Sequence, residues 1–175
     1  TRSDPPIVTT GGTSASYTEN GIAAVLDNSI TISDVDDTHI AGGTVTISSG
    51  YLTGDVLTLT GQGDINGGVS NSSGILTITT TAPVTSVTLA EYESALESIT
   101  YHNTLEDPTQ NNNSRDLTLT WVTNDANSDD AGTGISTVTS TITLTPSIDI
   151  PVVSDAGGTL TYTENDPPKI IDKLI

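Results

Sequence analysis

The chain has 175 residues, with 22 acidic and 4 basic side chains and a formal net charge of −18 at pH 7. This length allows one ordinary domain and part of a second, and the charge excludes binding to a nucleic acid backbone, which needs clustered Lys and Arg. Cysteine and methionine are absent, which excludes disulfides and thiolate metal sites. No stretch approaches the roughly 20 apolar residues of a membrane span, so we expect no membrane insertion.

The opening of the chain is repeated near its end. The segment PIVTTGGTSASYTEN (6–20) aligns without a gap with PVVSDAGGTLTYTEN (151–165), at a constant offset of 145 residues. Self-similarity at a fixed spacing indicates a tandem array, here with one whole domain per unit. The expected organisation is a linker, a complete unit, a second linker and the start of the next unit, at 1–8, 9–146, 147–153 and 154–175.

Between the two copies, apolar residues alternate with Thr or Ser, as in strands that bury one face. Gly, Asn, Asp and Ser separate these segments. The segments lie at 29–33, 43–48, 55–60, 75–80, 99–103, 116–121 and 136–145. The pattern predicts an all-β sandwich of about seven strands.

One segment, TLAEYESALESI (88–99), instead follows a helical period. Its apolar residues are spaced by three, four and three: Leu89, Tyr92, Leu96 and Ile99. This spacing predicts a short crossover helix over about 89–98. Thr88 and Glu91 have the spacing of a capping box, in which each side chain accepts a hydrogen bond from a free amide at the helix start.

Three carboxylates, Asp34, Asp36 and Asp37, crowd the end of an alternating segment, with no Lys or Arg within ten residues. Asp34 and Asp36 are two apart, so in extended chain their side chains point the same way and can bind one ion, while Asp37 either adds an oxygen or stays in water. Calcium takes about six to eight oxygen ligands. The spacing is not that of an EF-hand, because Val45 stands where the bidentate Glu is needed. A solvated acidic turn is the alternative.

The segments YTEN (17–20), ITISDVDD (30–37) and WVTNDA (121–126), with the linker segments SDPP and IDIP, follow the order of a cadherin repeat. SDVDDTHIAGGTVTIS, AEYESALESITYHNT and LEDPT are more closely similar to the cadherin-like repeats of bacterial RTX-type surface adhesins. This resemblance covers nearly the whole chain. It implies an Ig-like or cadherin-like Greek-key β-sandwich that acts as an extender repeat in cell adhesion and biofilm formation. It also implies an extracellular location at the bacterial surface.

The resemblance further implies calcium ions at the junctions between successive repeats of the same polypeptide, so that neighbouring repeats are the partners and other domains bind any glycan or protein receptor. The implied ligands are Asp4, Asp34, Asp36 and Asp125 at one pole of the domain, beside the candidate Asp37, and Glu19 and Asp149 at the other. Each set is half a site. Ile148 and Ile150 flank Asp149 where the linkers of the family more often read NDAP, which is a departure from the pattern.

No catalytic constellation accompanies the histidines, His39 and His102, and the chain lacks GxSxG and HExxH motifs, so we do not expect an enzyme. The alternative function is a calcium-dependent carbohydrate-binding or protein-binding sandwich. Sugar sites usually stack the ligand on an exposed aromatic ring, whereas Trp121 is in register with Leu117 and Leu119 and is expected to face the core. The recurring threonines also suggest ice binding, but Thr is a good strand former on any solvated face.

Overall fold

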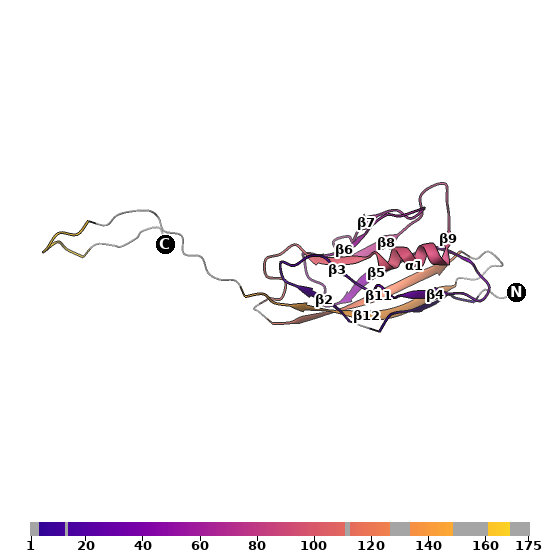
Figure 1. Cartoon of the computed structure of the whole chain (residues 1–175), viewed down its shortest axis with the longest axis horizontal. Helices are drawn as coiled ribbons and strands as arrows, with labels where there is room; N and C mark the ends of the chain where they lie inside the picture. Colours follow the sequence, from indigo (N-terminus) through magenta and orange to yellow (C-terminus); the bar gives the residue numbers. More distant parts are fainter. Residues whose placement is uncertain (1–3, 13, 111–112, 127–133, 149–160, 169–175) are drawn as a thin grey trace.

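In the computed structural model, the described part of the chain forms twelve strands and one helix (Figure 1). The described residues are 4–12, 14–110, 113–126, 134–148 and 161–168. The strands form an all-β sandwich, which confirms the predicted fold class. The strand count exceeds seven because the structure contains several short strands of two to four residues.

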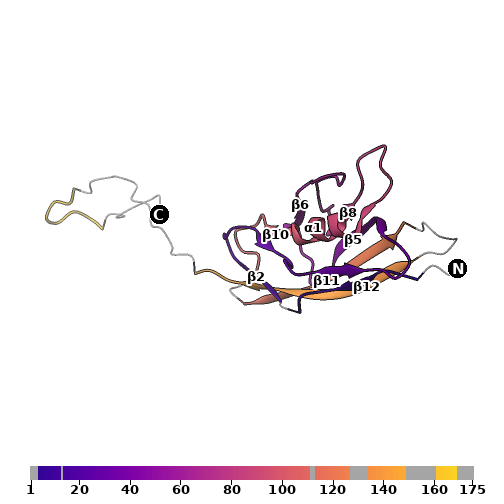
Figure 2. The same cartoon turned by 45° about the vertical axis from the view of Figure 1, so that its right-hand side comes forward.

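The larger sheet contains the three longest strands. Its order is β2 (Ala15–Thr18), β12 (Ile135–Thr145), β11 (Arg115–Asp125), β5 (His39–Ser49) and β8 (Ile75–Ile78), and β9 (Val87–Thr88) also pairs with β5. The smaller sheet has the order β3 (Ala24–Val25), β10 (Thr100–Asn103), β6 (Asp55–Leu59) and β7 (Gly68–Val69). Figure 2 shows the β11–β12 pair as one layer and β6, β10 and the helix as the other. The buried faces of these layers enclose the core.

The beginning of the chain forms strands in two different sheets, because β1 and β4 make up a separate two-stranded sheet. β1 (Ile7–Thr9) pairs antiparallel with β4 (Thr31–Ser33), whereas β2 pairs parallel with the last part of β12, with Ala15 opposite Ile142. β1 begins at Ile7, so an ordered strand reaches into the segment that the sequence assigned to a linker. Parallel pairing of β2 with β12 places the second and the last strands of the unit side by side.

The predicted crossover helix is confirmed as α1 (Leu89–Glu97). The Thr88 hydroxyl accepts a hydrogen bond from the Glu91 amide over 3.3 Å, as the capping pattern predicted. The second half of the capping box was wrong: Glu91 Oε1 accepts a hydrogen bond of 2.7 Å from the amide of Asp64. The Glu91 carboxylate reaches that loop amide instead of turning back to the helix start, and so it fastens the 61–67 loop to the helix.

Trp121 is 1% exposed, and its indole Nε1 donates to Ser140 Oγ over 2.8 Å. The prediction that this side chain faces the core is confirmed. Tyr17 of β2 and Tyr101 of β10 also meet in the core, with ring centroids 5.1 Å apart in an edge-to-face contact. Such a contact adds to the free energy of area burial, so these two rings help join the larger sheet to the smaller one.

A buried polar cluster centred on Asp55 joins β6, β10 and β11. Asp55 Oδ1 accepts hydrogen bonds from Tyr101 Oη (2.5 Å), Asn103 Nδ2 (2.7 Å) and Arg115 Nη2 (2.5 Å). Its Oδ2 accepts from the amide of Leu52 over 2.7 Å. Burial raises the pKa of Tyr101, so this hydroxyl remains a donor. Both carboxylate oxygens of Asp55 are therefore satisfied without any metal.

Gly43 in β5 has no space for a side chain. A Cβ atom at this position would collide with the carbonyl oxygen of Val122 and the hydroxyl of Tyr92. Overpacking in a well-packed interior typically costs about 1–3 kcal/mol, so Gly43→Ala should lower the urea midpoint of unfolding. The matched control is Gly68→Ala, where the nearest atom to a Cβ would be 3.9 Å away. Equal midpoints for the two variants would contradict this packing.

Candidate metal sites at the two poles

The predicted acidic residues lie at opposite ends of the sandwich. One end, which we name the acidic pole, carries Asp4, Asp34, Asp36, Asp37 and Asp125. The other end, which we name the exit pole, carries Glu19 and the segment 146–148 that follows β12. In Figure 1 the acidic pole is at the right, beside the N-terminus, and β12 runs from there toward the left. The eleven residues of β12 span most of this length.

At the acidic pole, Asp34 directly follows β4 and organises a turn. Its Oδ1 accepts hydrogen bonds from the amides of Asp36 (3.1 Å) and Asp37 (3.2 Å). Asp side chains commonly bind backbone amides that follow them in this way. The acidic turn considered as the alternative to a metal site is therefore present, and it uses one of the two carboxylate oxygens of Asp34.

Of the three remaining carboxylate oxygens of Asp34 and Asp36, one has a hydrogen-bond partner and two have none among the described residues. Asp36 Oδ2 accepts a hydrogen bond from the Asp4 amide over 3.0 Å. Asp34 Oδ2 and Asp36 Oδ1 are buried and have no hydrogen-bond partner among the described residues. Buried polar atoms without a partner are uncommon in folded proteins and point to a bound water or ion.

Electrostatics gives the same indication. Burial raises the pKa of Asp34, and the neighbouring Asp36 carboxylate adds to this rise. A raised pKa means that the ionised form of Asp34 is disfavoured in the folded chain. A hard cation would offset both the burial and the mutual repulsion, and carboxylate oxygens are the ligands that calcium prefers. The Asp34–Asp36 pair therefore fits a calcium ion.

The structure also brings Asp37 and Asp125 to the acidic pole, where they are 2% and 7% exposed. The Asp125 amide donates to the Gly134 carbonyl over 2.9 Å. A Cβ atom on Gly134 would lie 2.8 Å from Asp125 Oδ2 and 3.2 Å from the Cα atom of Pro5. The Asp125 carboxylate is therefore close to the chain segment that contains Asp4.

Within the described ranges, no three Asp, Glu, His or Cys side chains converge closely enough to enclose an ion by themselves. Asp4 meets Asp36 through its amide, and its side chain is exposed. The Asp34–Asp36 pair would thus supply a few of the oxygens that calcium needs. Backbone oxygens, water or another copy of the unit would have to supply the others.

At the exit pole, Glu19 is 4% exposed and holds the chain where it leaves β12. The Glu19 amide donates to the Thr145 carbonyl over 3.0 Å, and the Ser147 amide donates to Glu19 Oε2 over 2.9 Å. One carboxylate oxygen of Glu19 is thus used to hold the backbone at Ser147. Asp149, its predicted partner, lies outside the described residues.

The repeated TEN segment has the same local structure in both copies. Asn20 and Asn165 have positive φ angles of 57° and 71°, which Asn tolerates better than most residues. In each copy, the amide three residues after the threonine donates to the threonine carbonyl: Gly21 to Thr18 over 2.8 Å, and Asp166 to Thr163 over 3.0 Å. The repetition of TEN in the sequence is therefore also a repetition of the turn that it forms.

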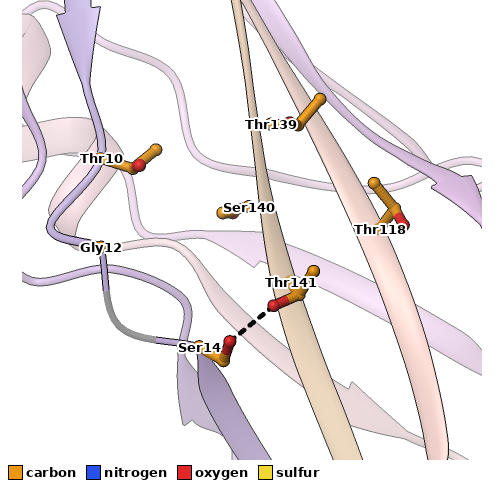
Figure 3. A pocket seen from close by; sticks show the side chains of 7 residues that line it. All are labelled: Thr10, Gly12, Ser14, Thr118, Thr139, Ser140 and Thr141. Carbon is orange, nitrogen blue, oxygen red and sulfur yellow. Dashed lines mark hydrogen bonds between the residues drawn. The ribbon is translucent and has the colours of Figure 1, made fainter.

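A hollow of about 230 Å³ lies beside β12 (Figure 3). It is lined by Thr10, Gly12, Ser14, Thr118, Thr139, Ser140 and Thr141. Ser14 Oγ and Thr141 Oγ1 share a hydrogen bond of 2.6 Å across it. This lining of hydroxyl groups offers a sugar no aromatic ring for stacking, so the hollow gives little support to a carbohydrate site.

Sequence reasoning missed two acids that accept hydrogen bonds from the backbone of distant segments. Asp27 is 5% exposed, and its Oδ2 accepts from the Gly11 amide over 2.7 Å, which holds the segment between β1 and β2. Glu93 of α1 accepts a hydrogen bond of 2.9 Å from the Ile32 amide, two residues before Asp34. The sequence DNS that begins at Asp27 is typical of a turn. No short-range signal marks Glu93, because its partner is 61 residues away.

Comparison with protein-family models, with curated proteins and with solved structures finds no match. Within the described ranges, no helix has both the length and the apolar character needed to cross a membrane.

Proposed function

We propose that this chain is a calcium-stiffened extender repeat of a bacterial surface adhesin, which projects a distal binding domain from the cell in adhesion and biofilm formation. The observation that carries this proposal is that the acidic pole and the exit pole lie at opposite ends of the sandwich. The chain enters beside Asp34 and Asp36 and leaves beside Glu19 at the opposite end. Units of this kind, joined end to end, extend along one axis.

The length of the unit supports a spacer role. A strand rises by about 3.4 Å per residue, so the eleven residues of β12 span about 37 Å. The 145-residue offset between the two copies of the opening segment leaves only a short linker between consecutive units. Each added unit therefore lengthens the array by roughly the length of its longest strands.

The residues of the acidic pole have separate roles in this proposal. The turn around Asp34 fixes the backbone, and Glu93 holds the end of β4 that leads into that turn. Asp34 Oδ2 and Asp36 Oδ1 would bind the ion, because these buried oxygens have no hydrogen-bond partner among the described residues. When bound, calcium supplies positive charge that draws oxygen ligands from two consecutive units together.

The net charge of −18 gives calcium a further effect. Like charges repel along an array of acidic units, and a short Pro-containing linker alone does not fix the angle between them. An ion shared between the exit pole of one unit and the acidic pole of the next would remove repulsion where it is strongest. This would make a flexible array rigid.

The proposal can be tested by small-angle X-ray scattering on a two-repeat chain, made of residues 1–150 followed directly by residues 6–175. We expect a larger maximum dimension in millimolar calcium than in chelator, because the ion restricts bending between the units. Asp36→Asn in the second unit should remove this difference. Asp64→Asn makes the same charge change on an exposed loop and should retain it.

Equal dimensions of the two-repeat chain in calcium and in chelator would overturn the stiffening role. The alternative function, a calcium-dependent carbohydrate-binding or protein-binding module, predicts a different result. In that case a glycan array probed with the chain would show binding in calcium that chelator removes.

A further inference from the structure

Three large apolar side chains are far more exposed than any other in the described part of the chain, and all three lie at the poles. Ile22 is 93% exposed, Ile148 is 90% exposed and Val35 is 85% exposed, whereas the next most exposed, Val69, is at 65%. Single exposed apolar residues are common on protein surfaces. Their concentration at the two ends of an elongated unit is the informative feature.

At the acidic pole, Val35 lies between Asp34 and Asp36. The unpartnered carboxylate oxygens of these two residues are buried, while the Val35 side chain is exposed. The tip of this pole is therefore an exposed apolar side chain that lies beside two carboxylates. Because it is exposed, the Val35 side chain contributes little to the core of its own unit.

At the exit pole, Ile148 follows Ser147, whose amide is held by Glu19. Ile22 follows the turn that starts at Thr18 and contains Glu19. Beside Ile22 is a hollow between β2 and β3, with walls that include Ala23, Ala24 and Val25. The exit pole therefore presents two exposed isoleucines and an adjoining recess with an apolar wall.

The covalent chain keeps these two surfaces close to each other in a tandem array. Six residues separate Thr145, the end of β12, from the position that lies 145 residues beyond Ile7, where β1 begins. At about 3.3–3.6 Å per residue, this linker spans at most about 25 Å. A short linker gives the second surface an effective concentration of the order of millimolar, so even a small apolar contact can form.

We infer that Val35 of each unit docks against Ile22 and Ile148 of the unit before it. This inference rests on the proposed tandem array, and it adds a specific contact that needs no metal ligand. The contact is heterologous, because different surfaces of the two copies meet, and such contacts build open linear assemblies. It also fixes which face of the acidic pole of one unit approaches the exit pole of the unit before it.

Cysteine cross-linking tests this contact, because the chain contains no cysteine and any introduced pair is unambiguous. In the two-repeat chain, Val35→Cys in the second unit is combined with Ile22→Cys or with Ile148→Cys in the first. The control pair replaces Val35→Cys with Val69→Cys, an exposed valine on β7 away from the poles. All substituted residues are exposed, so the fold should be retained.

A cysteine at position 35 is still a small apolar side chain that can occupy the contact, and a contact that contributes about 1.4 kcal/mol changes an equilibrium by a factor of about ten. We therefore expect at least one Val35 pair to form an intramolecular disulfide about tenfold faster than the control pair in calcium, measured by non-reducing electrophoresis. Rates equal to the control for both Val35 pairs would overturn the inference. If scattering still showed calcium-dependent stiffening in that case, the proposed function would stand without this contact. Fast cross-linking together with calcium-independent dimensions would support the contact and reject the stiffening.

Discussion

Replacing Asp55 with alanine should lower the free energy of unfolding by about 3–5 kcal/mol, as expected when one partner of a buried ion pair is removed. The Arg115 guanidinium would lose its carboxylate, and its side chain is only 13% exposed. The Tyr101 hydroxyl and the Asn103 amide would lose the same acceptor. Because domains are stable by only about 5–15 kcal/mol, this change removes a large part of the total.

Urea denaturation followed by tryptophan fluorescence measures this loss, since Trp121 is buried in the same sandwich. Asp116→Ala is the matched control. Asp116 is the neighbour of Arg115 on β11, and its exposed carboxylate accepts one hydrogen bond from Thr143. A similar loss in both variants would show that the Asp55 cluster contributes no more than a surface contact.

The second large effect should appear at Asp36, where Asp36→Asn is expected to change stability in opposite directions with and without calcium. In chelator, the amide removes one charge beside Asp34 and can donate to Asp34 Oδ2, which otherwise has no hydrogen-bond partner among the described residues, and this adds about 1 kcal/mol. For a chain of this size that corresponds to a rise of roughly 2–4 °C in melting temperature. In calcium, the variant should lose most of the stabilisation that ion binding provides.

Thermal melting of the 175-residue chain in millimolar calcium and in chelator checks both directions. A calcium concentration of 100 times the dissociation constant stabilises the folded state by about 2.7 kcal/mol. A difference of this order between calcium and chelator should largely disappear in Asp36→Asn. Asp64→Asn should leave both melting temperatures unchanged. A variant Asp36→Asn that melts lower in chelator and keeps its calcium response would contradict the assignment of Asp36 as a ligand.

Much of the fold could be predicted from local sequence patterns. Alternation of apolar residues with Thr located the segments of β5, β11 and β12, because the period of two follows directly from strand geometry. The helical stripe located α1 within one or two residues of its ends. The orientation of Trp121 toward the core also followed from its register with Leu117 and Leu119. These features depend on neighbours along the chain, and such information is present in a short window.

Features that depend on distant partners could not be predicted. Glu91 matched a capping motif, but its carboxylate instead bonds the Asp64 amide 27 residues away. Asp55 gave no signal in the sequence, because its ion-pair partner, Arg115, is 60 residues away. At the acidic pole, the spacing of Asp34 and Asp36 in extended chain suggested that their carboxylates point the same way, and in the structure the two carboxylates are close enough to interact, but across a turn. It did not reveal that Asp34 Oδ1 is already used by the turn.

The parallel pairing of β2 with β12 has a mechanical consequence. When the two ends of a unit are pulled apart, β2 and β12 are drawn in opposite directions along their own axes. The load then falls in shear on all the hydrogen bonds of the ladder from Ala15 to Thr18 together, instead of opening them one at a time. A tether made of such units would resist tension through its backbone ladders, even when side-chain contacts between units have given way.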